Sequence, residues 1–229
     1  MFSKKIKFIA TEEAMLDAWP HPKPASRFIP NEYKKLERFI NGDIHKGTVK
    51  TCIPFLDSLT AGYIIPFDQD YVVDPAGDDF SVKPANFLKE EFEFHYQYQL
   101  PPEWHDKVGV VAGKLHNKWL IKTPPGYSCL FTQPLNQNCP FKIIDGVVDT
   151  DVHPLIIHYP FYWTHDSQEP FLIKTGDPMV QIIPFKRESW KCSIEQIKDP
   201  NEMNKHHIKW GTKFKDIYKQ LVWKKKSYK

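Results

Sequence analysis

Hydrophobic residues along this chain come in short runs, separated by proline, glycine and aspartate. The clearest series lies between Thr123 and Phe185. Short apolar runs at regular spacing between turn residues are typical of a compact antiparallel unit. The pattern predicts a mainly β fold, a β-clip or sandwich, with this stretch at its centre. The predicted strands there are Tyr127–Thr132, Phe141–Val148, Leu155–Trp163 and Phe171–Lys174.

Further β segments precede that stretch. Lys5–Ile9 is predicted to be an edge strand, and the apolar runs Cys52–Leu56 and Gly62–Phe67 are predicted to be short strands. Phe92–Leu100 alternates aromatic and polar residues, which predicts a half-buried strand with its aromatic side chains in the core. Asp74–Asp79 is predicted to be a solvated loop, because it lacks the ligand spacing of a calcium-binding loop.

Helical patterns are confined to the two ends of the chain. Thr11 is the predicted N-cap of a short helix over 12–16, and Asn31 that of a second helix. Near the C-terminus, apolar residues from Trp210 to Val222 recur at helical spacing and predict a docked amphipathic helix. The lysines that follow, Lys224 to Lys229, are predicted to be solvated.

These patterns predict three parts. They are an N-terminal arm with short helices over 1–48, a β domain over 49–190, and a linker with the C-terminal helix and basic tail over 191–229.

Composition supports a folded, proline-stiffened β protein. The 229 residues are enough for one core, and 20 prolines against 10 glycines favour short strands with rigid corners. A net charge of +3 does not favour a polyanion binder, so nucleic acid is not an expected partner. No membrane-length apolar run and no signal-peptide core is present, so a cytoplasmic location is expected.

Candidate metal ligands are scattered. Cys52, Cys129, Cys139 and Cys192 form no C-x-x-C pair, so reduced thiols are expected in place of a zinc site. Three histidines with a neighbouring aspartate offer an alternative, a non-haem iron site. Their positions are His153, His158, His165 and Asp166. His153 and His158 are five residues apart, which would put them on opposite faces of one strand, and His158 is expected to hydrogen-bond within the sheet. No metal site is therefore predicted.

Asp149 and Asp151 are the main candidates for chemistry. They stand two residues apart at an apparent strand end, so both carboxylates should point to the same side. Two close carboxylates can hold a hard cation or raise the pKa of one of them for base catalysis. The alternative is that they simply flank a turn.

The segment Gly146-Val-Val-Asp149-x-Asp151, followed by Gly176-Asp-x-x-x-Gln181, resembles the trimeric dUTPase and dCTP deaminase superfamily. The resemblance covers 123–185 and implies a β-clip fold. It would make Asp149 the residue that orients the attacking water, with Asp151 beside it, and Mg²⁺ the cofactor if nucleotide binds. Asn136, Gln181, His153 and Tyr127 would be the ligand-binding candidates.

The sequence departs from that pattern where phosphate would bind. Val152 stands at the tyrosine position, and His153-Pro154 replace the arginine and glycine. Gln133-Pro134-Leu135-Asn136 lacks the arginine and serine that grip phosphate, and a triphosphate needs several such donors. These departures favour loss of the hydrolase chemistry.

Nearly the whole chain resembles an uncharacterised family of tailed-phage, notably marine, and bacterial proteins. The segments that carry this resemblance include Cys52-Ile-Pro-Phe-Leu-Asp-Ser-Leu-Thr-Ala-Gly62 and Thr123-Pro-Pro-Gly-Tyr127. The leading hypothesis is a phage-encoded, non-catalytic binding or structural protein, acting as a homo-oligomer or on another phage or host protein. The alternatives are a nucleotide-binding hydrolase of deoxynucleotides that uses Asp149, and a non-haem iron enzyme.

Overall fold

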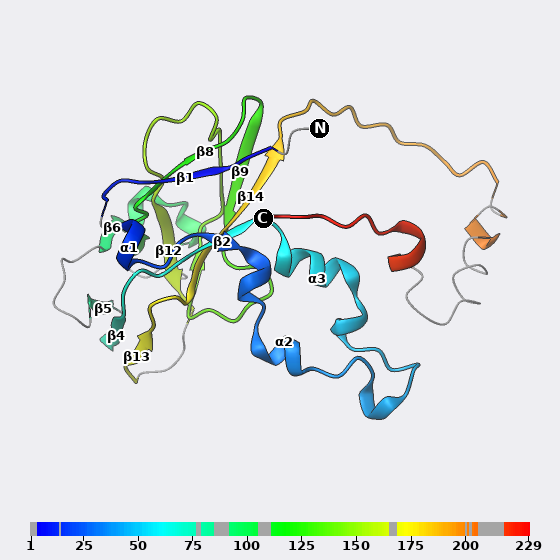
Figure 1. Ribbon diagram of the computed structural model, residues 1–229, viewed down its shortest axis with the longest axis horizontal. Coiled ribbons are helices and arrows are strands. Elements are labelled where there is room, and N and C mark those ends of the chain that lie inside the picture. Colours follow the sequence, from blue (N-terminus) through cyan, green and yellow to red (C-terminus); the bar gives the residue numbers. More distant parts are fainter. Residues whose placement is uncertain are drawn as a thin grey trace. The chain divides into compact units, whose positions relative to one another are not determined.

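The computed structural model describes residues 4–13, 15–76, 79–84, 92–104, 111–164, 169–199, 201, 203–205 and 218–229. Their secondary structure is mainly β, and the strands pair antiparallel, as the short apolar runs predict (Figure 1). The strands are β1 (Lys7–Ala10), β2 (Lys23–Pro24), β3 (Tyr63–Pro66), β4 (Tyr71–Ala76), β5 (Asp79–Pro84), β6 (Phe92–Tyr96), β7 (Val111–Leu115), β8 (Trp119–Lys122), β9 (Tyr127–Thr132), β10 (Phe141–Ile143), β11 (Gly146–Val148), β12 (Tyr159–Trp163), β13 (Phe171–Ile173) and β14 (Pro178–Lys186).

Helical structure in the described residues is short. The α-helices are α1 (Met15–Ala18), α2 (Asn31–Lys35) and α3 (Ile53–Thr60). Single 3₁₀ turns occur at Ala25–Phe28, Ile40–Gly42, Val49–Thr51, Gln97–Gln99 and Pro102–Trp104, and a wider turn at Tyr218–Val222. No described helix has the length and apolar character needed to cross a membrane.

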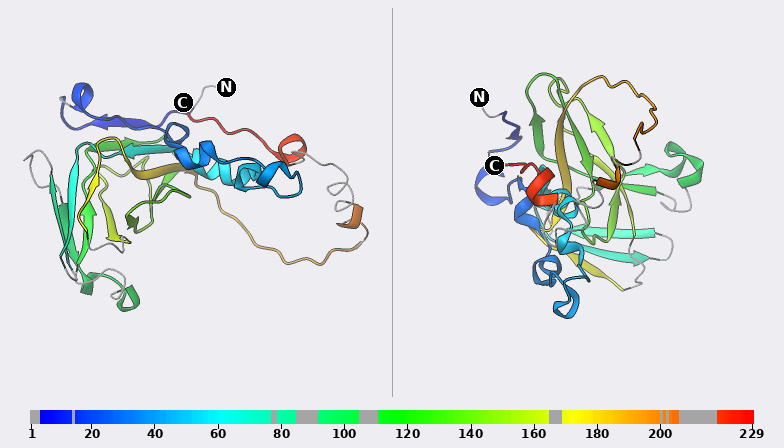
Figure 2. Two further views of the ribbon diagram at one scale, coloured as in Figure 1. Left: turned by 90° about the horizontal axis from the view of Figure 1, so that it is seen from below. Right: turned by 90° about the vertical axis from the view of Figure 1, so that its right-hand side faces the viewer.

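The chain forms two compact units. One comprises Met1–Ile29, Leu59–Arg187 and Tyr228–Lys229, and it holds the strands. The other comprises Pro30–Ser58 and Glu188–Ser227, with α2 and most of α3. Its residues 188–197 run without helix or strand (Figure 2). The three-part division expected from the sequence stays a prediction.

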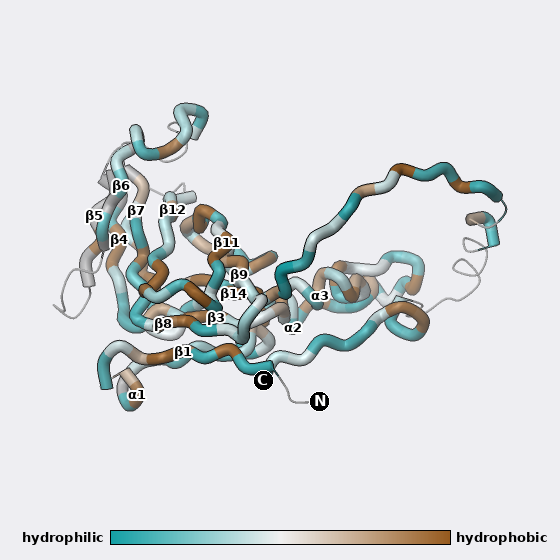
Figure 3. The backbone as a smooth tube through the Cα atoms, turned by 90° about the horizontal axis from the view of Figure 1, so that it is seen from above, coloured by the Kyte–Doolittle hydropathy of each residue, from teal (hydrophilic) through white to brown (hydrophobic). Residues whose placement is uncertain are grey.

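A five-stranded sheet in the order β11-β9-β14-β3-β2 organises the first unit. β14 is its longest strand and pairs with β3 on one side and β9 on the other. Cys129, Phe131 and Ile182 on these strands are at most 2% exposed and belong to the core. Apolar stretches follow the strands of this sheet in Figure 3, because burying them provides most of the stabilisation of a small domain.

A four-stranded sheet, β10-β12-β7-β6, supplies the aromatic part of the core. Phe141 lies edge-on to Phe161 and Phe67, with ring centroids 5.8 and 5.7 Å apart. Gly113 on β7 makes room for this packing, because a Cβ there would lie 2.3 Å from the Phe161 ring. The other sheets have the orders β13-β4-β5 and β1-β8.

The segment Cys52–Leu56, predicted as a strand, lies largely in the helix α3. Pro54 is the second residue of that helix, where a missing N–H is tolerated because first-turn N–H groups have no helical partner. The next run forms β3, as predicted.

Several boundaries also differ from the prediction. Phe141–Val148 divides at Asp145 into β10 and β11, which belong to different sheets. Leu155–Trp163 becomes strand only from Tyr159. The predicted loop over Asp74–Asp79 is partly strand, because β4 continues to Ala76 and β5 begins at Asp79. Alternation and turn residues do not reveal which neighbour supplies the hydrogen bonds that extend a strand.

The prediction of a single strand over Phe92–Leu100 is also wrong at its end. β6 stops at Tyr96 and a 3₁₀ turn follows. Tyr96 and Tyr98 are 58% and 75% exposed and stack on each other with centroids 5.5 Å apart, so they are not core residues. β6 is an edge strand, and the turn after it ends the alternation that would have buried them.

The helix caps differ too. Asn31 is the first residue of α2, with Pro30 at the N-cap position and no side-chain cap. The Thr11 hydroxyl donates to the Lys118 carbonyl, 3.0 Å away, and α1 begins only at Met15. Most of the predicted C-terminal helix lies outside the described residues, which resume at Tyr218.

Candidate functional site

The two candidate aspartates lie in a turn directly after β11. Val152 and His153 donate their backbone N–H groups to the Asp149 carbonyl, at 3.1 and 2.9 Å, so the chain coils back at this point. Thr150, between the aspartates, is fully buried, and its hydroxyl oxygen lies 2.7 Å from that of Thr123. This buried contact fixes the turn against the residue that follows β8.

Both carboxylates meet one arginine, Arg187, directly after β14. Its Nη1 and Nη2 donate to Oδ1 and Oδ2 of Asp151 at 2.8 and 2.6 Å, a two-pronged arrangement. Nη1 also lies 3.2 Å from Oδ1 of Asp149. The expectation that the two carboxylates share one side is therefore confirmed, and an internal guanidinium lies between them.

The environments of the two aspartates differ. The Asp151 side chain is only 5% exposed, and its Oδ2 also accepts the Gly126 backbone N–H at 2.8 Å. The Asp149 side chain is 57% exposed, and its Oδ1 accepts the Ser128 hydroxyl at 2.6 Å. Asp151 is thus held on both oxygens, whereas Asp149 stays accessible from solvent.

The ion pair sets the proton affinity of Asp151. The hydrogen bonds from Arg187, and to a lesser degree that from Gly126, hold the pKa of the Asp151 carboxyl well below its usual range. The carboxylates of Asp151 and Asp149 in turn raise the pKa of Arg187. A carboxylate stabilised in this way is a weak base, because hydrogen bonds to the charged form favour it. The expectation of a raised pKa for base catalysis does not hold for Asp151.

Gln181 lies at the other end of β14. Its side chain is fully buried: Oε1 accepts the Leu135 N–H at 2.7 Å, and Nε2 donates to the Ala61 carbonyl at 2.7 Å. Thr132 is its partner on β9, whereas Tyr127 is that of Lys186. The two pairs are five residues apart, which corresponds to roughly 17 Å along the strands. Within the chain, Gln181 is therefore remote from the aspartates.

Asn136 belongs to the Gln181 end. It is exposed, follows Leu135 and adopts a left-handed backbone, with φ +56°. The sequence prediction thus combined two separate places, one at Asp149 and Asp151 and the other at Asn136 and Gln181.

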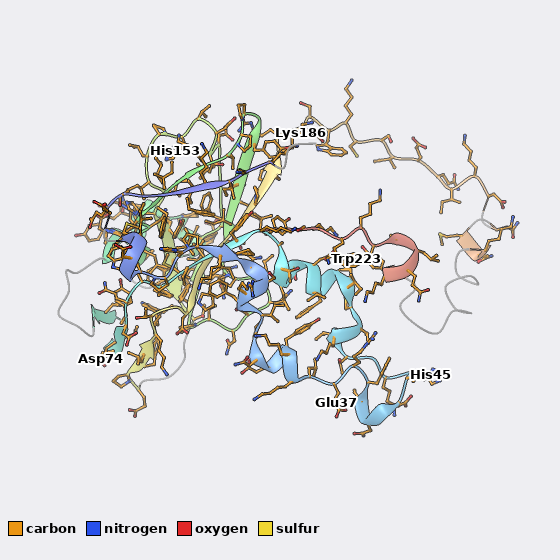
Figure 4. All side chains as sticks on the ribbon, in the orientation of Figure 1. Glu37, His45, Asp74, His153, Lys186 and Trp223 are labelled. Atoms are coloured by element: carbon orange, nitrogen blue, oxygen red, sulfur yellow. The ribbon has the colours of Figure 1, made fainter. Side chains whose placement is uncertain are left out.

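Tyr127 and His153 lie at the aspartate end. The Tyr127 carbonyl accepts from Arg187 Nη1 at 3.2 Å, and Lys4 Nζ lies 4.5 Å from the centroid of its ring. The His153 carbonyl accepts from Lys122 Nζ at 2.6 Å. Figure 4 labels His153, and also Lys186 at the end of β14. Both candidates contribute backbone atoms that brace the turn.

An exposed apolar row lies on the same face of the sheet as the Ser128 hydroxyl. Val147 pairs with Leu130, and Leu130 with Ile183, so these side chains share one face. Phe185 stands two residues further along β14, opposite Ser128, on that face. Val147 is 62% and Phe185 39% exposed. We call Val147, Leu130, Ile183 and Phe185 the apolar row; the ion pair lies at its end.

The candidate residues for an iron site can be checked only in part. His158 Nδ1 accepts the Asn117 backbone N–H at 3.3 Å, which confirms the expected hydrogen bond, although the segment from His153 to His158 is not a strand. His165 and Asp166 lie outside the described residues. Among the described ones, no group of three or more His, Cys, Asp or Glu side chains could hold a metal ion. The four cysteines, all described, are free thiols.

Arg187 is the residue that sequence reasoning missed. It is one of three arginines in the chain and directly follows the last strand of the sheet. The planar guanidinium of arginine can pair with a carboxylate through two hydrogen bonds, which a lysine ammonium cannot do. A rare arginine at a strand end could therefore have predicted an ion pair with a nearby aspartate.

Neither a protein-family model nor a curated protein matches the chain. Solved structures that are similar to it include two phage dUTPases. One is a mutant dUTPase from phage phi11 of S. aureus, with a coordinated structural Mg(II) ion, at 14% identity and a TM-score of 0.33, covering 62% of this chain and 85% of that one. The other is a mutant dUTPase of Staphylococcus bacteriophage 80alpha with dUpNHpp, at 13% identity and a TM-score of 0.33, covering 78% and 88%. Such likenesses do not bear on the chemistry of the site, which follows from this chain's own contacts.

Proposed function

We propose that this chain is a non-catalytic binding or structural protein that acts through an interface with another protein chain. The observation that carries the proposal is the pairing of Asp149 and Asp151 with Arg187. A carboxylate that activates water or holds Mg²⁺ needs free lone pairs. Both oxygens of Asp151 already accept hydrogen bonds from Arg187 and Gly126 of the same chain.

Gln181 supports the same proposal. Its amide is fully buried and spans two backbone groups, Leu135 N–H and Ala61 C=O. A side chain in this position holds loops together and has no group left facing solvent. Its role is therefore structural, and the likeness of its sequence segment to an enzyme motif reflects the fold.

The apolar row gives the proposed interface. It combines exposed aliphatic and aromatic side chains with Arg187 at its border, and arginine and aromatic residues are enriched at interface centres. In the other unit, Trp190 and Ile194 are 86% and 97% exposed on the segment 188–197. In the proposed complex a partner chain covers these side chains.

The proposed setting is a phage, with the protein in the host cytoplasm or the virion. It rests on the resemblance of the sequence to uncharacterised phage and bacterial proteins. The proposed partner is a second copy of the chain or another phage or host protein.

The test is a thermal-shift panel of deoxynucleoside mono-, di- and triphosphates with Mg²⁺, run on the wild type and Asp149→Ala. A ligand that binds only the native state at a hundredfold excess over its Kd adds about 2.7 kcal/mol of stability. The proposal expects no nucleotide-specific shift. A shift that Asp149→Ala abolishes would overturn it, and turnover assays would follow.

One observation favours the rival, a nucleotide-binding hydrolase: the Asp149 carboxylate is accessible and meets Arg187 through a single oxygen. A nucleotide or its Mg²⁺ could reach the other oxygen without breaking the Asp151 pair. The same thermal-shift panel distinguishes the two functions, because a nucleotide-binding hydrolase requires a nucleotide-specific rise in melting temperature and the main proposal expects none.

A further inference from the structure

The helix α3 carries a second acidic position, far along the chain from the aspartate turn. The Asp57 side chain is only 19% exposed, and both of its oxygens accept the indole N–H of Trp223 at 3.0 Å. Lys226 Nζ donates to the same Oδ2. The prediction that the lysine tail is simply solvated is therefore wrong for Lys226, because one carboxylate receives two donors from the C-terminal segment.

The local backbone aims Trp223 at this carboxylate. The Trp223 N–H donates to the Tyr218 carbonyl at 2.8 Å, which closes the wide turn Tyr218–Val222. Between 218 and 227 only Tyr218 and Trp223 are half-buried, and the remaining side chains are exposed. Figure 4 labels Trp223 on this segment, which runs past α3 in Figure 1. The segment is thus held through the indole and one ammonium group.

The support of Asp57 is independent of the C-terminal segment. Phe55 stacks on Tyr33 of α2 with ring centroids 5.6 Å apart. The Ser58 hydroxyl donates to the Phe55 carbonyl at 2.7 Å, and Lys50 Nζ donates to the Leu36 carbonyl at 2.8 Å. These contacts position the backbone of α3 around Asp57, and none of them involves the C-terminal segment.

We infer that Asp57 is the centre of a recognition site for a basic Trp-x-x-Lys peptide, and that the chain's own C-terminus occupies this site. The partly buried carboxylate selects an indole N–H together with an ammonium group three residues further on. Charged hydrogen bonds of this kind are stronger than neutral ones.

The decisive experiment is binding in trans to the full-length chain. Trp223→Ala/Lys226→Ala removes both donors and vacates the site. A fluorescein-labelled peptide Trp-Lys-Lys-Lys-Ser-Tyr-Lys should then bind saturably in fluorescence anisotropy. Wild type should bind it at least about tenfold more weakly, because a tethered tail competes at high effective concentration. Adding Asp57→Asn to the vacated variant should abolish binding, and a peptide with alanine for tryptophan should not bind.

Limited trypsin digestion of the full-length chain provides the second measurement. Asp57→Asn should accelerate cleavage after Lys224 and Lys225 by about tenfold, because a charged hydrogen-bond acceptor is lost. Asp43→Asn is the matched control: it removes the carboxylate paired with Lys46 in the same unit, and cleavage should stay at the wild-type rate. Peptide binding that does not depend on Asp57, or an unchanged cleavage rate in Asp57→Asn, would overturn the inference.

Discussion

Arg187 grips Asp151 with two hydrogen bonds, of 2.8 Å from Nη1 and 2.6 Å from Nη2, across 36 positions of sequence. The contact joins the end of β14 to the turn after β11, and the Arg187 backbone N–H reinforces it by donating to the Gly126 carbonyl at 2.9 Å. One ion pair thereby closes the end of the sheet and occupies both oxygens of Asp151, one of the two candidate carboxylates.

Asp151→Asn should destabilise the protein in a pH-dependent manner. The pKa of Asp151 is lowered in the folded state, so its stabilisation is full above the unfolded value of about 3.9 and is lost as pH falls through the folded pKa. Urea unfolding should show the variant less stable at pH 7, with the gap narrowing below about pH 4. Asp145→Asn, which loses only a 3.8 Å surface contact with Lys142, is the control. A gap that is independent of pH would contradict this assignment.

Gln181→Met should destabilise the fold by about 2–4 kcal/mol, because it leaves the Leu135 N–H and the Ala61 carbonyl without their partner in a buried place. Chemical denaturation measures the change. The exposed Gln196→Met serves as control and should stay within about 0.5 kcal/mol of wild type. Equal stability of the two variants would show that Gln181 does not brace the loops.

Gly62→Ala should cost about 3 kcal/mol. Gly62 has φ +68°, and a Cβ there would lie 2.0 Å from the Ile182 carbonyl oxygen, so both strain and a backbone clash result. Gly176→Ala separates the two effects, since Gly176 has φ +90° with nothing within 4 Å of its Cβ position. It should lose only about 1 kcal/mol in thermal or urea unfolding. A similar loss of stability in Gly62→Ala and Gly176→Ala would show that the contact with the Ile182 carbonyl oxygen adds nothing to the backbone strain.

Val147→Lys should weaken association through the apolar row without unfolding the monomer, because Val147 is 62% exposed. Analytical ultracentrifugation and crosslinking of the wild type over a concentration series measure self-association, and a pull-down measures other partners. Val72→Lys changes a 40% exposed valine on β4, in a different sheet, and should behave like wild type. If both lysine variants associate normally, the apolar row is not the interface.

The stability of the four-stranded sheet should fall between pH 7 and 5. The pKa of His158 is lowered, first by burial and then by His116 and Lys114, while Glu93 opposes the shift. Its neutral form therefore stabilises the fold above the unfolded value of about 6.5, and this is lost as pH falls. The His158 and His116 ring centroids are 4.6 Å apart, and His116 is among the neighbours that disfavour the charged form of His158.

His158→Gln should flatten this part of the stability curve, as followed by urea unfolding from pH 7.5 to 5. The exposed His45→Gln should keep the wild-type slope. If the His158→Gln curve keeps that slope as well, the pH dependence comes from other groups.

Part of the molecule followed from the sequence by itself. Apolar runs between proline and glycine predicted the antiparallel β fold, and the runs over β3, β9 and β13 identified strands nearly to the residue. The two-residue spacing of Asp149 and Asp151 also predicted that their carboxylates would point to the same side, where both contact Arg187. These features are local: side-chain alternation and turn chemistry act over a few residues, and the sequence displays them directly.

Only the tertiary structure decided what those carboxylates meet. The register of β14 against β9 brings Arg187 to Asp151. It places Gln181 five residues, or roughly 17 Å along the strands, from the Lys186–Tyr127 pair that precedes this contact. The tertiary structure likewise decides that Cys52–Leu56 lies largely in the helix α3 and that Trp223 contacts Asp57, 166 positions away. A residue's partner across a sheet depends on pairing and burial along the whole chain. For this reason the sequence identified the candidate residues, and the fold determined that they form an ion pair and a structural brace.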